Sequence, residues 1–120
     1  MEILNLESAE HTPNVILNKK NGIFEISGRS LPEDSAKFYR PVLEWIEAYA
    51  AEPNPSTEFV FKLEYFNTAS SKLILDVLSA LEDIKGMKII WYFYDDDEDM
   101  EEAGEEFSEL VEIPFEFKTY

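Results

Sequence analysis

The chain has 120 residues, of which 45% are hydrophobic and 14% aromatic, so it can form a folded domain with one core. Its net charge of −16 repels nucleic acid phosphates and anionic lipid, and it has no cysteine for a disulfide or a thiolate nucleophile. No run is apolar enough for a membrane span, and the N-terminus lacks a signal-peptide pattern. We therefore predict one cytoplasmic domain, residues 1–120, that binds neither nucleic acid nor membrane.

Three short strands are predicted near the N-terminus. They are enriched in β-branched and other apolar residues, and they span Glu2–Leu6, Val15–Leu17 and Ile23–Ile26. The Asn21-Gly22 pair separates the second and third candidates, and this pair is typical of tight hairpin turns. The chain is therefore expected to open with an antiparallel hairpin.

A helix is predicted between Asp34 and Pro53. Its apolar stripe consists of Phe38, Val42, Trp45/Ile46 and Tyr49. Pro41 lies inside this stripe, and a proline in a helix interior costs about 3 kcal/mol, whereas at the first helical position it costs little. We therefore predict one turn over Asp34–Tyr39 and a main helix that begins near Arg40.

The stretch from Glu58 to Gly86 predicts a strand, a polar corner and a second helix. Alternate residues of the strand are apolar, so one face should be covered by Phe59, Phe61, Leu63 and Tyr65. Beyond the corner, apolar residues recur at helical spacing and predict a helix over Lys72–Lys85, with Gly86 as its C-cap.

Thr68 lies in the corner where this strand becomes a helix. Its hydroxyl could cap the helix by accepting a hydrogen bond from the amide of Ser70 or Ser71. The free amides and the helix dipole at such a position also favour an anion by about 0.3–1 kcal/mol. The residues alone therefore leave two interpretations open, a simple helix cap and a phosphate acceptor.

The C-terminal third predicts a strand over Met87–Tyr94 in the sheet interior, an acidic helix, and an edge strand over Ile113–Phe117. The acidic helix has a weak apolar stripe made of Met100, Ala103, Phe107 and Leu110. Strand-helix-strand connections of this kind are right-handed and parallel. The predicted fold class is therefore α/β, a single domain with a mixed sheet, packed helices and an N-terminal hairpin.

Few residues offer chemistry of their own. Asp95, Asp97, Asp99 and Glu106 match positions 1, 3, 5 and 12 of a calcium-binding loop, but Met100 stands where that loop needs glycine. The single histidine, His11, has no triad partners nearby, and Ser70 and Ser71 lack a nucleophile-elbow motif. We expect no catalytic residue, no metal and no cofactor, with a divalent-cation site as a minor alternative.

Three segments, at fitting separations, resemble the SiaC family of bacterial regulatory phosphoproteins, and they are Gly28–Ser35, Phe38–Trp45 and Tyr65–Ser71. The resemblance spans essentially the whole chain and implies a fold like the STAS domains of anti-sigma factor antagonists. It implies that Thr68 is the phosphoacceptor. The surroundings of the phosphosite, which would also bind partners, are then Asn67, Ala69, Ser70, Ser71 and Lys72. The motif residues without an assigned role are Gly28, Arg29, Ser30, Pro32 and Glu33.

The resemblance also implies a non-enzymatic partner switch. A histidine-kinase-like (GHKL, anti-sigma type) serine/threonine kinase phosphorylates such a protein, and a PP2C-type phosphatase reverses this. The unphosphorylated form binds and activates a diguanylate cyclase, which links it to cyclic-di-GMP and biofilm signalling. The alternative is an anti-sigma factor antagonist, although Asn67-Thr68 replaces the Asp-Ser pair common there. We expect the amides of Ala69, Ser70 and Ser71, together with Lys72, to stabilise the phosphate.

Overall fold

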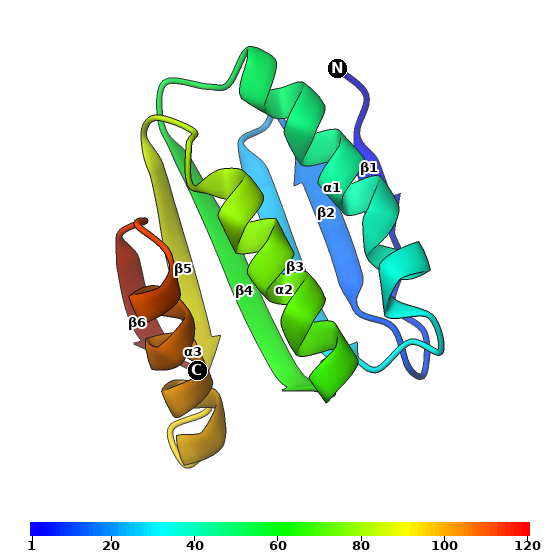
Figure 1. Ribbon diagram of the computed structural model, residues 1–120, viewed down its shortest axis with the longest axis vertical. Helices are drawn as coiled ribbons and strands as arrows, with labels where there is room; N and C mark the ends of the chain where they lie inside the picture. Colours follow the sequence, from blue (N-terminus) through cyan, green and yellow to red (C-terminus); the bar gives the residue numbers. More distant parts are fainter.

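A six-stranded sheet and three helices make up the computed structural model, which describes residues 1–120 (Figure 1). The strands are β1 (Leu4–Leu6), β2 (Asn14–Asn18), β3 (Ile23–Ser30), β4 (Thr57–Phe66), β5 (Met87–Phe93) and β6 (Phe115–Thr119). The helices are α1 (Ser35–Ala51), α2 (Thr68–Leu81) and α3 (Glu98–Leu110). None of the three helices combines the length and the apolar character needed to cross a bilayer.

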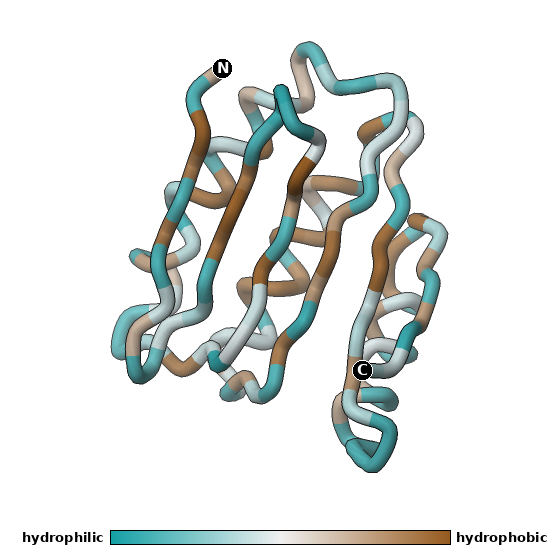
Figure 2. Tube along the Cα trace, turned by 180° about the vertical axis from the view of Figure 1, so that it is seen from behind, coloured by the Kyte–Doolittle hydropathy of each residue, from teal (hydrophilic) through white to brown (hydrophobic).

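The strands lie in the sheet in the same order as in the chain. β1, β2 and β3 pair antiparallel, whereas β3, β4, β5 and β6 pair parallel. The three parallel connections place α1, α2 and α3 on one face of the sheet (Figure 1), and the opposite face carries no helix (Figure 2). The predicted mixed α/β fold and its N-terminal hairpin are therefore confirmed.

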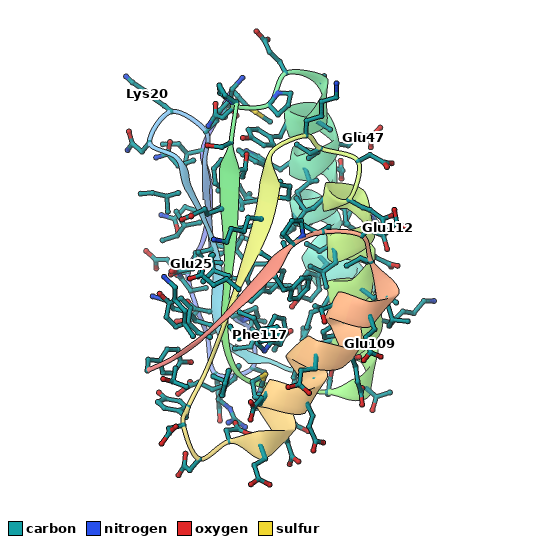
Figure 3. The ribbon with its side chains drawn as sticks, turned by 90° about the vertical axis from the view of Figure 1, so that its left-hand side faces the viewer. Lys20, Glu25, Glu47, Glu109, Glu112 and Phe117 are labelled. Atoms are coloured by element: carbon teal, nitrogen blue, oxygen red, sulfur yellow. The ribbon has the colours of Figure 1, made fainter.

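The core lies between the sheet and the helix layer. Its largest fully buried side chains are aromatic, and they are Trp91, Tyr39, Tyr49, Phe59 and Phe61. Figure 3 shows the two layers edge-on, with Glu25 on the uncovered face of the sheet and Glu47 on the helix side. Charged side chains therefore surround a core that is almost entirely apolar.

Helix α1 runs without a break through Pro41, so the predicted division of this helix was wrong. Tyr39 and Val42 lie on either side of the proline and are both fully buried, so packing holds both halves in one helix. Asp34 caps the helix by accepting a hydrogen bond from the Lys37 amide at 3.0 Å. The buried stripe includes Tyr39, while Phe38 is only half-buried.

A β-bulge changes the side on which the end of β4 presents its side chains. Gly28 pairs with Leu63 but Arg29 pairs with Tyr65, so Glu64 is an extra residue on β4. Tyr65 is therefore 46% exposed, and the prediction that it shares the covered face was wrong. Phe66 turns toward the core in its place.

The junctions on either side of β5 differ from prediction. Helix α2 begins at Thr68 and ends at Leu81, and Gly86 is not its C-cap. Gly86 instead has a positive φ of 77°, and its carbonyl accepts a hydrogen bond from the Thr57 amide at 2.9 Å. The interior position of β5 is confirmed, and the predicted edge strand forms as β6, two residues later than expected.

Candidate functional site

Helix α2 begins directly beyond the carboxyl end of β4 (Figure 1). Thr68 is the first residue of this helix, and it is exposed. Asn67 is the N-cap, because its extended backbone precedes the helix and its side-chain oxygen accepts from the Ser70 amide at 2.8 Å. Of the two interpretations of Thr68, the one that makes it the helix cap is therefore wrong. With the cap made by its neighbour, the hydroxyl of Thr68 is free of that role.

Two of the amides at the start of α2 already have partners. The Ser70 amide donates to the Asn67 side chain, and the Ser71 amide donates to the Asn67 carbonyl at 2.9 Å. They are not available to an anion, which corrects the expectation that they would stabilise a phosphate. The amides of Thr68 and Ala69 precede the first helical hydrogen bond, so the cap leaves them for another acceptor.

Three buried hydroxyls lie beneath this turn. Ser30 Oγ is 2.6 Å from Tyr39 Oη and 2.9 Å from Ser70 Oγ, and none of the three side chains is exposed. Burial raises the pKa of Tyr39 to about 12, and its hydrogen bond with Ser30 offsets part of this rise. The Ser30 carbonyl also accepts a hydrogen bond from the Asn67 amide at 3.1 Å. Ser30 therefore makes two hydrogen bonds to this turn, one through its side chain and one through its backbone.

The motif residues Gly28, Arg29, Ser30, Pro32 and Glu33 divide into different environments. Gly28 has a positive φ of 100° at the β-bulge, which favours glycine there. The Arg29 guanidinium lies 5.2 Å from the centre of the exposed Tyr65 ring, an interaction between a cation and an aromatic face. Pro32 is buried and Glu33 is exposed just before α1. Of the five, Ser30 is the one that hydrogen-bonds to the turn carrying Thr68.

A groove of about 420 Å³ runs between α2 and α3, with Thr68 on its wall. From α2 and the end of β4 it is lined by Phe66, Thr68, Ser71, Lys72 and Leu75, and from α3 by Ala103, Glu106, Phe107 and Leu110. Lys72 is one helical turn beyond Thr68, and Leu110 is 64% exposed although the sequence placed it in the apolar stripe of α3. A second cavity of about 280 Å³ shares Phe66 and Ala103 with this groove.

The sequence did not reveal the groove, because its two walls are far apart in the chain. Leu75, Glu106 and Leu110 were not predicted as site residues. A signal for them existed in the helical spacing, since residues 68, 71, 72 and 75 share one face of α2, and 103, 106, 107 and 110 share one face of α3. Only the fold shows that these faces line the same groove.

The acidic residues from Asp95 to Glu109 do not form a calcium-binding loop. Residues from Glu98 onward are helical, and Asp97 is the N-cap of α3 with its side chain on the Met100 amide at 3.0 Å. No three acidic or histidine side chains of residues 1–120 lie close enough together to hold a metal ion. The run is therefore mainly an exposed helix face, on the side where Figure 3 labels Glu109.

A protein family and a curated protein both match nearly the whole chain. The model of a family described as "SiaC family regulatory phosphoprotein" matches residues 6–120. An uncharacterized protein of Pseudomonas aeruginosa strain UCBPP-PA14 is 29% identical over 119 residues, which cover 96% of this chain and 94% of that protein.

Solved structures agree with this family match. The crystal structure of apo-SiaC from Pseudomonas aeruginosa has a TM-score of 0.89 and 28% identity, with 98% of this chain and 99% of that chain covered. SiaC in the crystal structure of the diguanylate cyclase SiaD in complex with its activator SiaC, also from Pseudomonas aeruginosa, has a TM-score of 0.91 and 27% identity at the same coverage. The chain therefore belongs to the SiaC family of regulatory phosphoproteins.

Proposed function

We propose that this protein is a partner switch controlled by phosphorylation of Thr68. The observation that carries the proposal is the position of Thr68, which is exposed at the start of α2 and lines the groove between α2 and α3. Membership in a family of regulatory phosphoproteins supports the modification. The switch is proposed to act by binding alone.

The surroundings of Thr68 fit a phosphate. Phosphorylation adds about −1.5 to −2 charges and three acceptor oxygens at this side chain. The amides of Thr68 and Ala69, the positive end of the α2 dipole and Lys72 would all interact favourably with that charge. The fold should therefore tolerate the modification with little rearrangement.

The same phosphate would disfavour a partner bound in the groove. The apolar residues that line the groove include Phe66 and Phe107, and Glu106 lines it as well. A phosphate on Thr68 would reduce the apolar surface that a partner can contact. A partner that binds there would also have to bury a strongly hydrated dianion. Phosphorylation should therefore weaken binding at the groove.

The partner that we propose is a diguanylate cyclase, bound and activated by the unphosphorylated form. The support is the structure of SiaD in complex with SiaC, whose fold this chain shares. A GHKL-type serine/threonine kinase would add the phosphate, and a PP2C-type phosphatase would remove it. The phosphorylation state of Thr68 would then control the level of cyclic-di-GMP.

The test compares wild type with Thr68→Ala, Thr68→Glu and, as a matched exposed threonine, Thr119→Ala. Mass spectrometry after incubation with the cognate kinase and ATP should find phosphate in wild type and Thr119→Ala, and none in Thr68→Ala. Calorimetry should show that Thr68→Ala binds the cyclase as wild type does and that Thr68→Glu binds it more weakly. Phosphate on another residue would contradict the proposal. A pull-down with this protein that retrieves an anti-sigma factor in place of a cyclase would also contradict it.

A further inference from the structure

Thr68 is flanked by residues that form a closed ring of hydrogen bonds through Ser30. The Asn67 amide donates to the Ser30 carbonyl at 3.1 Å, Ser30 Oγ donates to Ser70 Oγ at 2.9 Å, and the Ser70 amide donates to Asn67 Oδ1 at 2.8 Å. The ring therefore fixes the residue before Thr68 and the residue two positions after it. Thr68 and Ala69 are the two residues of this turn outside the ring, and both are exposed.

The direction of the buried hydrogen bonds follows from counting protons. Ser30 has one hydroxyl proton. When it donates this proton to Ser70, the neutral phenol of Tyr39 supplies the proton in the 2.6 Å contact between Ser30 and Tyr39, whereas an ionised Tyr39 would accept from Ser30. Tyr39 belongs to α1, Ser30 to β3 and Ser70 to α2. One chain of directed bonds thus connects three elements of the fold at the turn that carries Thr68.

Packing alone does not require these hydroxyls. The buried residues next to them on the same elements are apolar, for example Val42 on α1 and Ile74 on α2. An apolar contact would hold α1 against α2 but would leave the rotation of the first turn of α2 less defined, because the hydrophobic effect has no direction. Buried hydrogen bonds are directional, so they favour one arrangement of the elements that they join.

We propose that Ser30 and Ser70 are positioning residues for the modification at Thr68, and this inference rests on the function proposed above. Through the ring they orient the first turn of α2, so that the Thr68 hydroxyl and the amides of Thr68 and Ala69 face solvent in a fixed arrangement. This assigns a role to Ser30 within the segment Gly28–Ser35. Tyr39 supports the ring from α1 and is not part of it.

The experiment measures kcat and KM for phosphorylation of Thr68 by the cognate kinase with ATP. The variants are Ser30→Ala and Ser70→Ala, which open the ring from opposite sides, and Tyr39→Phe, which removes the supporting hydroxyl and leaves the ring intact. Ser27→Ala is the matched control, because Ser27 lies on the same strand and its side chain has no hydrogen bond. Circular dichroism melts set a temperature at which all of these proteins are folded.

Ser30→Ala and Ser70→Ala should each lower kcat by about three- to tenfold, the effect of losing one orienting hydrogen bond. KM should stay near the wild-type value, because the exposed surface that meets the kinase is unchanged. Tyr39→Phe should melt at a lower temperature than wild type and yet keep kcat within about twofold of it. Ser27→Ala should match wild type in both respects.

Each other result counts against the inference. If kcat falls in parallel with melting temperature across all variants, Tyr39→Phe included, the hydroxyls serve stability alone and the positioning role is wrong. If Ser30→Ala and Ser70→Ala are phosphorylated at the wild-type rate, the ring does not orient Thr68. Absence of phosphate on Thr68 in wild type would instead refute the proposed function itself, so the two failures are distinguishable.

Discussion

Gly104 lies so close to Trp91 that a Cβ atom at position 104 would come within 2.5 Å of the indole Cδ1 atom. The same indole donates its N–H to the Met100 carbonyl at 3.0 Å. These two contacts hold α3 against β5, and they thereby set the position of one wall of the groove beside Thr68. The distance between helix and sheet here depends on a residue without a side chain.

Gly104→Ala should therefore lower the free energy of unfolding. Alanine gains about 1 kcal/mol in helix propensity, but overpacking against a buried ring costs about 1–3 kcal/mol, so the net change should be a loss. Urea denaturation followed by Trp fluorescence measures it. Glu105→Ala, at the adjacent exposed position, is the control and should not destabilise the protein. A stabilised Gly104→Ala would mean that α3 is free to move away from Trp91.

Asn67→Ala should destabilise the protein more than Thr68→Ala does. The Asn67 side chain caps α2, and loss of such a cap costs about 1 kcal/mol, whereas the exposed Thr68 side chain makes no hydrogen bond in the fold. Chemical denaturation of both variants under identical conditions gives the comparison. Equal losses, or a larger loss for Thr68→Ala, would contradict the assignment of the cap.

Alkaline stability should depend on Tyr39. Because its pKa is raised from 10.0 to about 12, the folded state holds the phenol proton more tightly than the unfolded chain does. The resulting stability is fully present below pH 10 and is lost at about 1.4 kcal/mol per pH unit as the pH rises toward 12.

Urea denaturation midpoints, measured from pH 8 to pH 12 in steps of about one pH unit, test this dependence. Tyr39→Phe should be less stable than wild type at neutral pH but should lose less stability with rising pH. Tyr65→Phe, at an exposed tyrosine, serves as the control. Parallel curves for wild type and Tyr39→Phe would show that Tyr39 does not titrate in this way.

Leu110→Glu should weaken binding of the proposed partner, a diguanylate cyclase, while leaving the fold intact. Leu110 is 64% exposed and lines the groove, so the change places a charge on the proposed docking surface at little cost in stability. An affinity loss of tenfold or more is expected if the partner covers this carboxylate without a counter-charge. Ile23→Glu, at an exposed apolar residue on the N-terminal hairpin, should bind as wild type. Unchanged affinity for Leu110→Glu would place the interface elsewhere.

Most of the fold follows from local pattern. The Asn21-Gly22 turn, the apolar run that forms β5 and the alternation over Phe59, Phe61 and Leu63 were sufficient to predict a mixed sheet with its hairpin. The pattern fails at Tyr65, because the bulge that turns it outward depends on pairing with β3 and on the positive φ of Gly28. It fails at Pro41 as well, because burial on both sides of the proline outweighs its local penalty.

The candidate site is less accessible to sequence reasoning. The corner itself could be located, since a change of hydrophobic period marks it, but propensity does not decide between Asn67 and Thr68 as the cap, because both types are good N-cap residues. Ser30 and Ser70 are forty residues apart, and their contact exists only once β3 and α2 lie side by side. The groove likewise needs the tertiary placement of α3.

Every strand of the sheet pairs only with its neighbours in the chain, from β1 through to β6. A polypeptide emerging from the ribosome can therefore add each strand to the growing edge without displacing an earlier pair. Ser30, Tyr39, Asn67 and Ser70 all precede the end of α2, whereas the acidic helix and its supporting tryptophan come afterwards. We expect the scaffold around Thr68 to assemble during translation before the opposite wall of the groove has been made.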